Sequence, residues 1–251
     1  SGWTLFCVHD GHGPYGHHVS TRTVQTVPWF LIQDSGFDKD LIDEDRIEQA
    51  LLHAFEKSQA DLVRYAAENK IDIADSGSTA LAVLLKGNKV WTANLGDCRS
   101  VVGSAEAELI FETEDHKPQH RVEKARIEAA GGEVRLEQVT HRIFIRGTDD
   151  PGLAVARAFG DLGLKDHGVI AVPEVKVTEV DLNKNPFVLI ASDGIWEFID
   201  SDEVVAGLGF KLRKMGAEAA LQELHSHAKC KWTETCGNYR DDMTSILVQL
   251  R

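Results

Sequence analysis

Three apolar, β-branched runs at positions 78–85, 89–95 and 99–103 follow one another with only three residues between neighbours. Parallel strands need a crossover of a dozen or more residues, whereas antiparallel strands can be joined by a short turn. We therefore expect these runs to form antiparallel hairpins. Strands clustered in this way favour an α+β fold over a doubly wound parallel sheet.

Further strands and helices are predicted on both sides of this cluster. Four more strands are indicated by apolar runs bounded by turn residues, at 3–8, 175–180, 187–191 and 244–250. Four helices are indicated by apolar residues at helical spacing, at 16–30, 46–69, 122–130 and 217–229. Asp200-Ser201-Asp202-Glu203 resembles a capping box and predicts the start of another helix. Since no repeat and no Pro/Gly/Ser linker interrupts residues 1–251, we expect a single domain.

Charge and composition exclude several classes of function. The chain carries 40 acidic and 27 basic side chains, a net charge of -13 without a basic cluster, so we expect no binding to nucleic acid. Its apolar stretches are far shorter than the roughly 18 residues that cross a bilayer, so we expect no membrane span. The four cysteines form no C-x-x-C pair, which predicts reduced thiols and an intracellular location, cytoplasmic or nuclear.

Aspartates stand at the ends of four predicted strands. Asp10 follows the first strand, Asp97 and Asp193 follow two others, and Asp241 comes shortly before the last. If these ends share one edge of the packed sheets, the carboxylates repel one another unless a cation neutralises them. Hard oxygen ligands select Mg²⁺ or Mn²⁺. The sequence therefore predicts a site for divalent cations.

The neighbours of these aspartates form ordered motifs. They are Asp10-Gly11-His12-Gly13, Asn94-Leu95-Gly96-Asp97, Asp115-His116-Lys117-Pro118, Arg126-Ile127-Glu128-Ala129-Ala130-Gly131-Gly132, the run 153–161 ending in Phe159-Gly160-Asp161, Ser192-Asp193-Gly194-Ile195-Trp196-Glu197 and Arg240-Asp241-Asp242-Met243-Thr244. With these motifs, the chain resembles the metal-dependent protein serine/threonine phosphatases of the type 2C family over nearly its whole length.

The resemblance implies an antiparallel β-sandwich with helices on both faces, in α-β-β-α layers, and water activated by two Mg²⁺ or Mn²⁺ ions to hydrolyse phosphoserine and phosphothreonine. It implies that Asp10 bridges both ions, that Gly11 offers its carbonyl and that Asp193 and Asp241 bind one ion each. It also implies a third, weaker ion near Asp97, Asp193 and Glu197, although Asp is more usual than Glu at the last position. His12 matches the proposed general acid for the leaving alcohol.

The resemblance carries three further expectations. The region 120–150 matches the flap of the family, and we expect a monomer whose partners are phosphorylated proteins. Family members carry an Arg that receives the substrate phosphate in a segment before the first strand, so we expect such a segment upstream of this sequence. Without it, an inactive phosphatase-like scaffold or binding module is the alternative.

A remote alternative is a dinucleotide-binding oxidoreductase. Gly11-His12-Gly13-Pro14-Tyr15-Gly16 satisfies G-x-G-x-x-G between a predicted strand and a predicted helix. The short hairpins that follow argue against the βαβ unit that this fingerprint requires. Neither Cys7 nor Cys98 lies in a glycine-rich phosphate loop followed by Arg, which argues against a cysteine-dependent phosphatase.

Overall fold

The first sheet is apolar on both faces because it is covered on both. In the computed structural model, which describes residues 2–35 and 44–251, this sheet has the order β1-β4-β5-β12 and is antiparallel throughout. Its strands are β1 (Thr4–Val8), β4 (Ala80–Lys86), β5 (Lys89–Leu95) and β12 (Glu174–Glu179). Along β4, Leu81 and Val83 pack between the two sheets, while Ala82 and Leu84 pack against helices. Alternate side chains of one strand therefore serve two cores.

The second sheet packs on the first and has the order β14-β13-β6-β7, again antiparallel. Its strands are β6 (Arg99–Gly103), β7 (Leu109–Glu112), β13 (Phe187–Ala191) and β14 (Ser245–Gln249). Val188 and Ile190 face the first sheet, whereas Phe187 and Leu189 face a helix on the outer side. This sheet-on-sheet packing is a β-sandwich.

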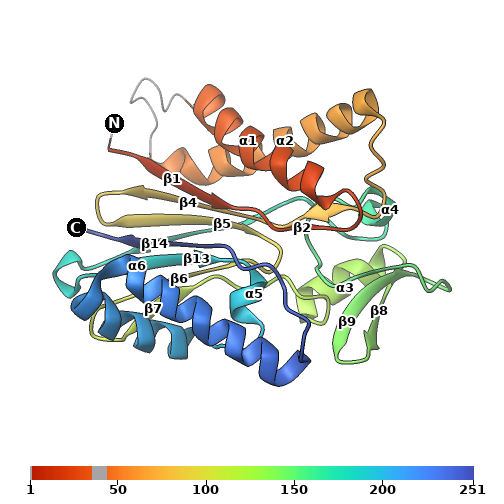
Figure 1. Ribbon diagram of the computed structural model, residues 1–251. Coiled ribbons are helices and arrows are strands. Elements are labelled where there is room, and N and C mark those ends of the chain that lie inside the picture. The colour runs from red at the N-terminus through yellow and green to blue at the C-terminus, as the bar shows by residue number, and fades with distance from the viewer. Residues whose placement is uncertain (1, 36–43) are drawn as a thin grey trace.

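Helices cover both outer faces of the sandwich (Figure 1). α1 (Gly16–Ser35) and α2 (Ile47–Asn69), with the 3-10 turn η2 (Glu44–Arg46) before α2, cover the first sheet. α6 (Ser201–Cys236) covers the second sheet and is interrupted at Gly216, where φ is 82°. The break at Gly216 separates the helix that begins after Asp200 from the helix predicted at 217–229, so both predicted helices lie within α6. The predicted α-β-β-α layers are confirmed.

Local signals explain where these helices begin and which side they bury. The expected apolar stripe of α2, which includes Ile47, Leu51, Phe55 and Leu62, is buried. The Asp200 side chain accepts a hydrogen bond from the Glu203 backbone N–H at 2.8 Å and caps the start of α6. Among the described residues, no helix combines the length and the apolar character that crossing a membrane requires.

One of the expected hairpins is wrong. β4 and β5 pair as a hairpin, but β5 and β6 belong to different sheets. Gly96, with φ of 107°, lies in the short connection between them, and this turn carries the chain from one sheet across to the other. A short gap between apolar runs predicts an antiparallel neighbour, but here the short connection leads from a strand of one sheet to a strand of the other.

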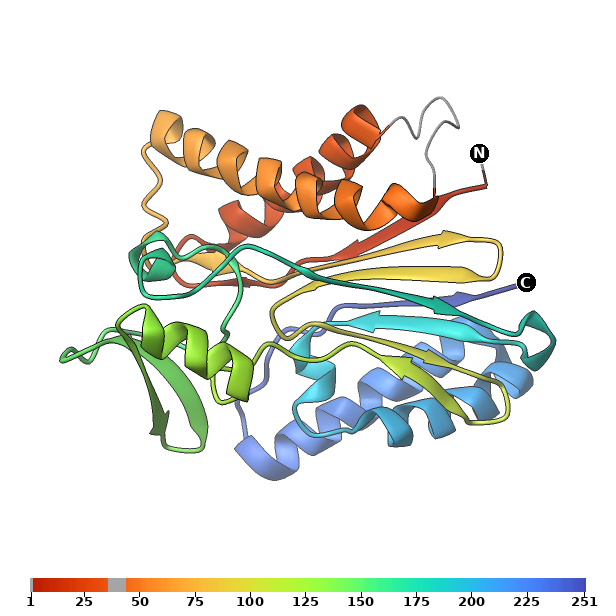
Figure 2. The same cartoon turned by 180° about the vertical axis from the view of Figure 1, so that it is seen from behind.

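A smaller lobe stands at one end of the sandwich, away from both termini (Figures 1 and 2). It contains α3 (Arg121–Ala129) and the antiparallel sheet of β8 (Gly132–Glu137), β9 (Thr140–Ile145) and β10 (Pro151–Leu153). Its apolar side chains, among them Ile127 and Ile143, form a cluster of their own with Leu164. The lobe spans the region expected to be a flap, but the sequence did not predict its strands.

Short elements complete the described chain. They are β2 (Gly11–His12), β3 (Gly77–Ser78), β11 (Phe159–Gly160), α4 (Leu162–Lys165), η3 (Leu182–Lys184) and α5 (Asp193–Trp196). β2, β3 and β11 form a small antiparallel sheet. The G-x-G-x-x-G run therefore belongs to an antiparallel context and leads from β2 into α1. The glycine run is therefore not part of a parallel βαβ unit, which a dinucleotide-binding site would require.

Candidate active site

A cavity of about 290 Å³ lies where the ends of the sandwich strands meet the small lobe. Six residues predicted from the sequence line it: Asp10, Gly11, His12, Asp97, Asp193 and Asp241. The four aspartates come from four separate strand ends and share one space. This convergence is the arrangement that their positions in the sequence predicted.

Asp10 is held by the last residue of β3, Ser78, and by Thr79, which follows it. Its backbone N–H donates to Thr79 Oγ1 at 3.2 Å, and its carbonyl accepts from the Thr79 N–H at 2.9 Å and from Ser78 Oγ at 3.0 Å. Gly11 comes next, and a Cβ at this position would collide with the backbone of Gly16 at the start of α1. Glycine is therefore required where the chain turns from the strand into the helix.

The residues on both sides of Asp193 are held by hydrogen bonds that involve two tryptophans and a serine. Trp196 Nε1 donates to the Ala191 carbonyl at 2.9 Å, and Trp232 Nε1, from α6, donates to the Gly194 carbonyl at 2.8 Å. Ser192 Oγ accepts from the Thr244 N–H at 3.1 Å, which joins the Asp193 segment to the chain that enters β14 beside Asp241. The two aspartates therefore belong to one locally braced region.

Asp97 differs from the other three aspartates because it has a cation of its own. Lys117 Nζ lies 2.5 Å from Asp97 Oδ2, and the carboxylate is 7% exposed. Burial opposes the charged form of Lys117, but Asp97 outweighs it and raises the pKa of the ammonium group. This ion pair lies in the Asp115-His116-Lys117-Pro118 motif, to which we had assigned no role.

Asp10 and Asp193 lie in surroundings that disfavour their charged forms. Burial, together with repulsion from Asp241 and Asp97, raises the pKa of Asp10 to about 6, although a side-chain hydrogen bond with Asp193 opposes the shift. Burial, together with repulsion from Asp97, Asp10 and Asp241, raises the pKa of Asp193 to about 9. A nearby cation would reverse both shifts.

The donor set fits hard divalent cations. Asp193 Oδ1 is buried and has no hydrogen-bond partner within the described part of the chain. Carboxylate oxygens and a backbone carbonyl such as that of Gly11 are the ligands that Mg²⁺ and Mn²⁺ prefer. Within residues 2–35 and 44–251, no three His, Cys, Asp or Glu side chains are already gathered tightly enough to hold an ion as they stand. The aspartates influence one another's pKa across the cavity.

His12 forms a pair that the sequence analysis missed. Its Nε2 lies 2.8 Å from Asp161 Oδ2, and the Asp161 side chain is only 3% exposed. Gly77 makes room for this pair, because a Cβ there would collide with both the carboxylate and the imidazole. Burial opposes protonation of His12, but the charge and hydrogen bond of Asp161 outweigh it and raise the pKa of His12. Asp161 ends one of the quoted motifs, which was the available signal.

Glu197 is the predicted site residue that the structure does not bring to the cavity. It is exposed at the C-terminal end of α5, and it is absent from the described residues that line the cavity. Four helical positions displace it by about 6 Å along the axis from Asp193. The geometry therefore gives no support to a role of Glu197 in binding a third ion. Of the three residues expected at that ion, only Asp97 and Asp193 line the cavity.

The small lobe contributes a cation to the cavity. Arg142, from β9, is the only Lys or Arg among the described lining residues. Its Nη1 donates to the Gly152 carbonyl at 2.7 Å, and its Nε lies 3.3 Å from Glu137 Oε2. Nothing in the local sequence around Arg142 distinguished it from a surface arginine of a hairpin.

Fold and site together define a class: α-β-β-α proteins with a carboxylate-lined cavity at one end of a β-sandwich. The chain belongs to the protein phosphatase 2C family, whose model, described as "Protein phosphatase 2C", matches residues 1–232. The resemblance inferred from the motifs is thereby confirmed.

Individual relatives agree with this assignment. "Probable protein phosphatase 2C 64" of Oryza sativa subsp. japonica is 39% identical over 212 residues, which cover 79% of this chain and 47% of that protein. "Probable protein phosphatase 2C 72" of Arabidopsis thaliana is 31% identical over 257 residues, covering 97% of this chain and 76% of that protein. The chain thus spans about half the length of the rice relative.

A solved structure has the same fold. The serine-threonine phosphatase 2C from Toxoplasma gondii superimposes with a TM-score of 0.80 at 23% identity, covering 99% of this chain and 85% of that one.

Proposed function

We propose that this chain hydrolyses phosphoserine and phosphothreonine in proteins with the help of two Mg²⁺ or Mn²⁺ ions. One observation carries the proposal: four aspartates from separate strand ends share a single cavity, where burial and mutual repulsion raise the pKa of Asp10 and Asp193. Such a cluster is poorly stable on its own and is well suited to cations. Asp10, the Gly11 carbonyl, Asp193 and Asp241 would hold the ions.

Bound ions would supply Lewis acidity, bind phosphate oxygens and make water a competent nucleophile at neutral pH. The chain's own contribution begins with the position of the substrate. Arg142 offers the positive charge on the lobe side of the cavity, opposite the aspartates, and can bind a phosphate oxygen. The lobe would then serve as the flap expected from the resemblance.

His12 is the general acid in this proposal. Asp161 favours the protonated imidazole and is bonded to its Nε2, which leaves Nδ1 to carry the proton that the leaving seryl or threonyl oxygen needs. Proton donation is required for these oxygens because alkoxides are poor leaving groups.

A cysteine nucleophile is not part of the proposal. Burial raises the pKa of Cys7 to about 12 and raises that of Cys98 as well, so both thiols stay protonated. Cys230 and Cys236 are free, exposed and on α6, outside the cavity-lining residues. Phosphorylated proteins are the expected partners of a monomeric chain, and a cytoplasmic or nuclear location stays a prediction.

The test is phosphate release from phosphoserine and phosphothreonine peptides, with Mn²⁺ and with EDTA. We expect release only with the ion, and none from Asp193→Ala. Calorimetric titration with Mn²⁺ distinguishes an inactive scaffold, which would bind peptide or ion without turnover. Release that persists in EDTA would refute the two-ion mechanism.

A further inference from the structure

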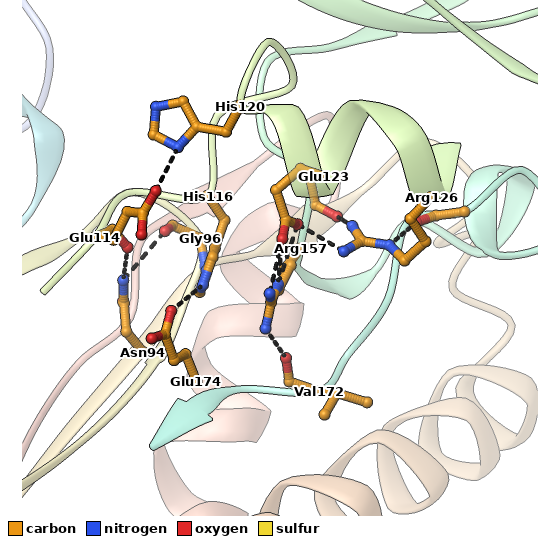
Figure 3. Close-up of polar contacts among 12 residues, drawn as sticks. Asn94, Gly96, Glu114, His116, His120, Glu123, Arg126, Arg157, Val172 and Glu174 are labelled. Carbon is orange, nitrogen blue, oxygen red and sulfur yellow. Dashed lines mark hydrogen bonds and ion pairs between the residues drawn. The ribbon is translucent and has the colours of Figure 1, made fainter. Parts of the chain in front are cut away.

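His116 is a buried histidine that lies between segments of the chain that reach the cavity. Its side chain is 3% exposed. The backbone N–H of His116 donates to the Gly96 carbonyl at 2.9 Å, and the Gly96 N–H donates back to His116 Nδ1 at 3.0 Å (Figure 3). The His116 carbonyl accepts from the Ala156 N–H at 2.7 Å. One residue therefore bonds to the turn after β5 and to the segment after β10.

These bonds define which ring nitrogen carries the proton. A backbone N–H can only donate, so Nδ1 must be the unprotonated nitrogen, and a neutral ring then has its proton on Nε2. Burial and the nearby Arg157 lower the pKa of His116 to about 4, against opposing effects of Glu123 and Glu174. In the described part of the chain, Nε2 has no hydrogen-bond partner, and Glu174 Oε2 lies 3.6 Å away. The ring therefore binds the Gly96 turn through one acceptor atom, Nδ1.

The turn that His116 holds contains half of an ion pair at the cavity. His116 and Gly96 are bonded to each other, and the next residue after each, Lys117 and Asp97, form the ion pair. A Cβ at Gly96 would collide with the side chain of Thr79, whose hydroxyl accepts from the Asp10 N–H. A shift of this turn would therefore reach both Asp97 and the support of Asp10.

The opposite side of His116 is equally well braced. Arg126 Nη2 donates to the Ala156 carbonyl at 2.8 Å, and Arg126 and Arg157 both bind the Glu123 carboxylate, each with a 2.7 Å contact. Glu123 is 5% exposed and belongs to α3 of the small lobe. The segment 153–155, which lines the cavity, is thus tied to His116 and to the lobe through Ala156.

We propose that His116 is a positioning residue whose Nδ1, by accepting from the Gly96 N–H, fixes the turn that presents Asp97 to Lys117 at the cavity. Its effect on hydrolysis rests on the function proposed above, whereas its effect on the turn does not. His116 is absent from the described residues that line the cavity, and its Nδ1 acts on the site through Gly96.

The first experiment reads the tautomer directly. Long-range ¹H–¹⁵N correlation spectra of the ¹⁵N-labelled chain should show His116 with an unprotonated Nδ1 and a protonated Nε2, unchanged from about pH 6 to pH 8. A proton on Nδ1 would overturn the proposal whether or not the chain is a phosphatase.

The second experiment compares two substitutions of similar polarity. The Oδ1 of His116→Asn falls where Nδ1 lies and can accept from Gly96, whereas the acceptor of His116→Gln falls near Nε2 and cannot. We expect His116→Gln to lower kcat for a phosphopeptide by about tenfold or more and to move the Asp97 and Lys117 amide resonances. His116→Asn should restore the resonances and most of kcat. His120→Asn, at a half-exposed histidine whose ring contacts Glu114, is the matched control and should change neither.

If His116 served folding alone, kcat of both variants would fall only in proportion to their loss of stability, measured by urea unfolding, whichever acceptor the new side chain offers. That result would overturn the proposal. If the wild-type chain releases no phosphate with Mn²⁺, the proposed function fails, and the amide resonances of the two variants alone decide the role of His116.

Discussion

The charge repulsion around Asp193 leads to a quantitative prediction for Asp193→Asn. The pKa of this carboxyl is raised from its ordinary value of 3.8 to about 9 by burial and by Asp97, Asp10 and Asp241. Between these values the folded chain holds a proton that the unfolded chain releases, so without metal ions the stability must fall as the pH rises through this window. An asparagine carries no charge and removes this dependence.

The magnitude follows from the size of the pH window. About three pH units separate pH 7 from the unfolded pKa, and each unit is worth about 1.4 kcal/mol, so Asp193 costs at most about 4 kcal/mol at pH 7 and about 2 kcal/mol at pH 5. Solvent reaches part of this half-buried carboxyl and screens the repulsion, which makes these values upper limits. We expect Asp193→Asn to be the more stable protein in EDTA, by a margin that grows with pH.

The assay is urea unfolding followed by circular dichroism at several pH values between about 5 and 8, with EDTA and with Mn²⁺. Mn²⁺ should stabilise the wild-type chain more at pH 8 than at pH 6, because more protons must leave the aspartates at low pH, and it should stabilise the variant little. Asp242→Asn, at an exposed neighbouring carboxyl, is the control and should shift stability by tenths of a kcal/mol. A variant in EDTA that is less stable than the wild-type chain at pH 8, or a margin independent of pH, would refute the reasoning.

Three further predictions concern the residues around the cavity. Asp161→Asn removes the charge that raises the pKa of His12, so the pH above which activity falls should move downward in a pH–rate profile, and peptides should be slowed more than p-nitrophenyl phosphate, whose leaving group needs no proton. Arg142→Ala should raise KM for a phosphopeptide about tenfold without changing Mn²⁺ affinity by calorimetry, because the guanidinium binds phosphate and holds no ion. Gly77→Ala should lower the free energy of unfolding by about 1–3 kcal/mol, since the methyl group displaces the His12–Asp161 pair.

Each of these has a control or a contrary outcome. Asp166→Asn, at the other end of α4 from Asp161, should leave the pH–rate profile unchanged. An equal effect of Asp161→Asn on both substrates would contradict proton donation by His12. A lower Mn²⁺ affinity of Arg142→Ala would contradict the prediction that Arg142 binds phosphate without affecting the ions. For Gly77→Ala, the exposed Gly87→Ala in the β4–β5 turn adds strain without a collision, and a larger loss there would contradict the steric argument.

Local patterns in the sequence predicted most of the secondary structure of the sandwich, but they missed the edge strand β7. α2 has an apolar stripe at helical spacing, which predicts burial on one side, whereas β4 and β13 are continuous apolar runs, which indicate strands buried on both faces. The β8–β9 hairpin was missed because its inward side chains, such as Val134 and Ile143, pack only into the small cluster of the lobe and leave a weak alternation.

The aspartates show where local information ends. Their positions at strand ends predicted that Asp10, Asp97, Asp193 and Asp241 would meet, because strands of packed sheets end at common edges. Which of them is neutralised by Lys117, and which are left to repel one another, depends on distances between segments far apart in the chain. The family motifs contained Lys117 and Asp161 but did not state what they touch.

By itself, the sequence determined most of the strands and helices, the acidic strand ends and the family, because each of these depends on short runs of neighbouring residues. Only the tertiary structure decided that β6 joins the second sheet, that Glu197 lies outside the cavity and that His116 accepts from Gly96. The physical reason is that burial and Coulomb interaction depend on separation in space, and a turn of three residues can either pair two strands or carry the chain from one sheet to the next.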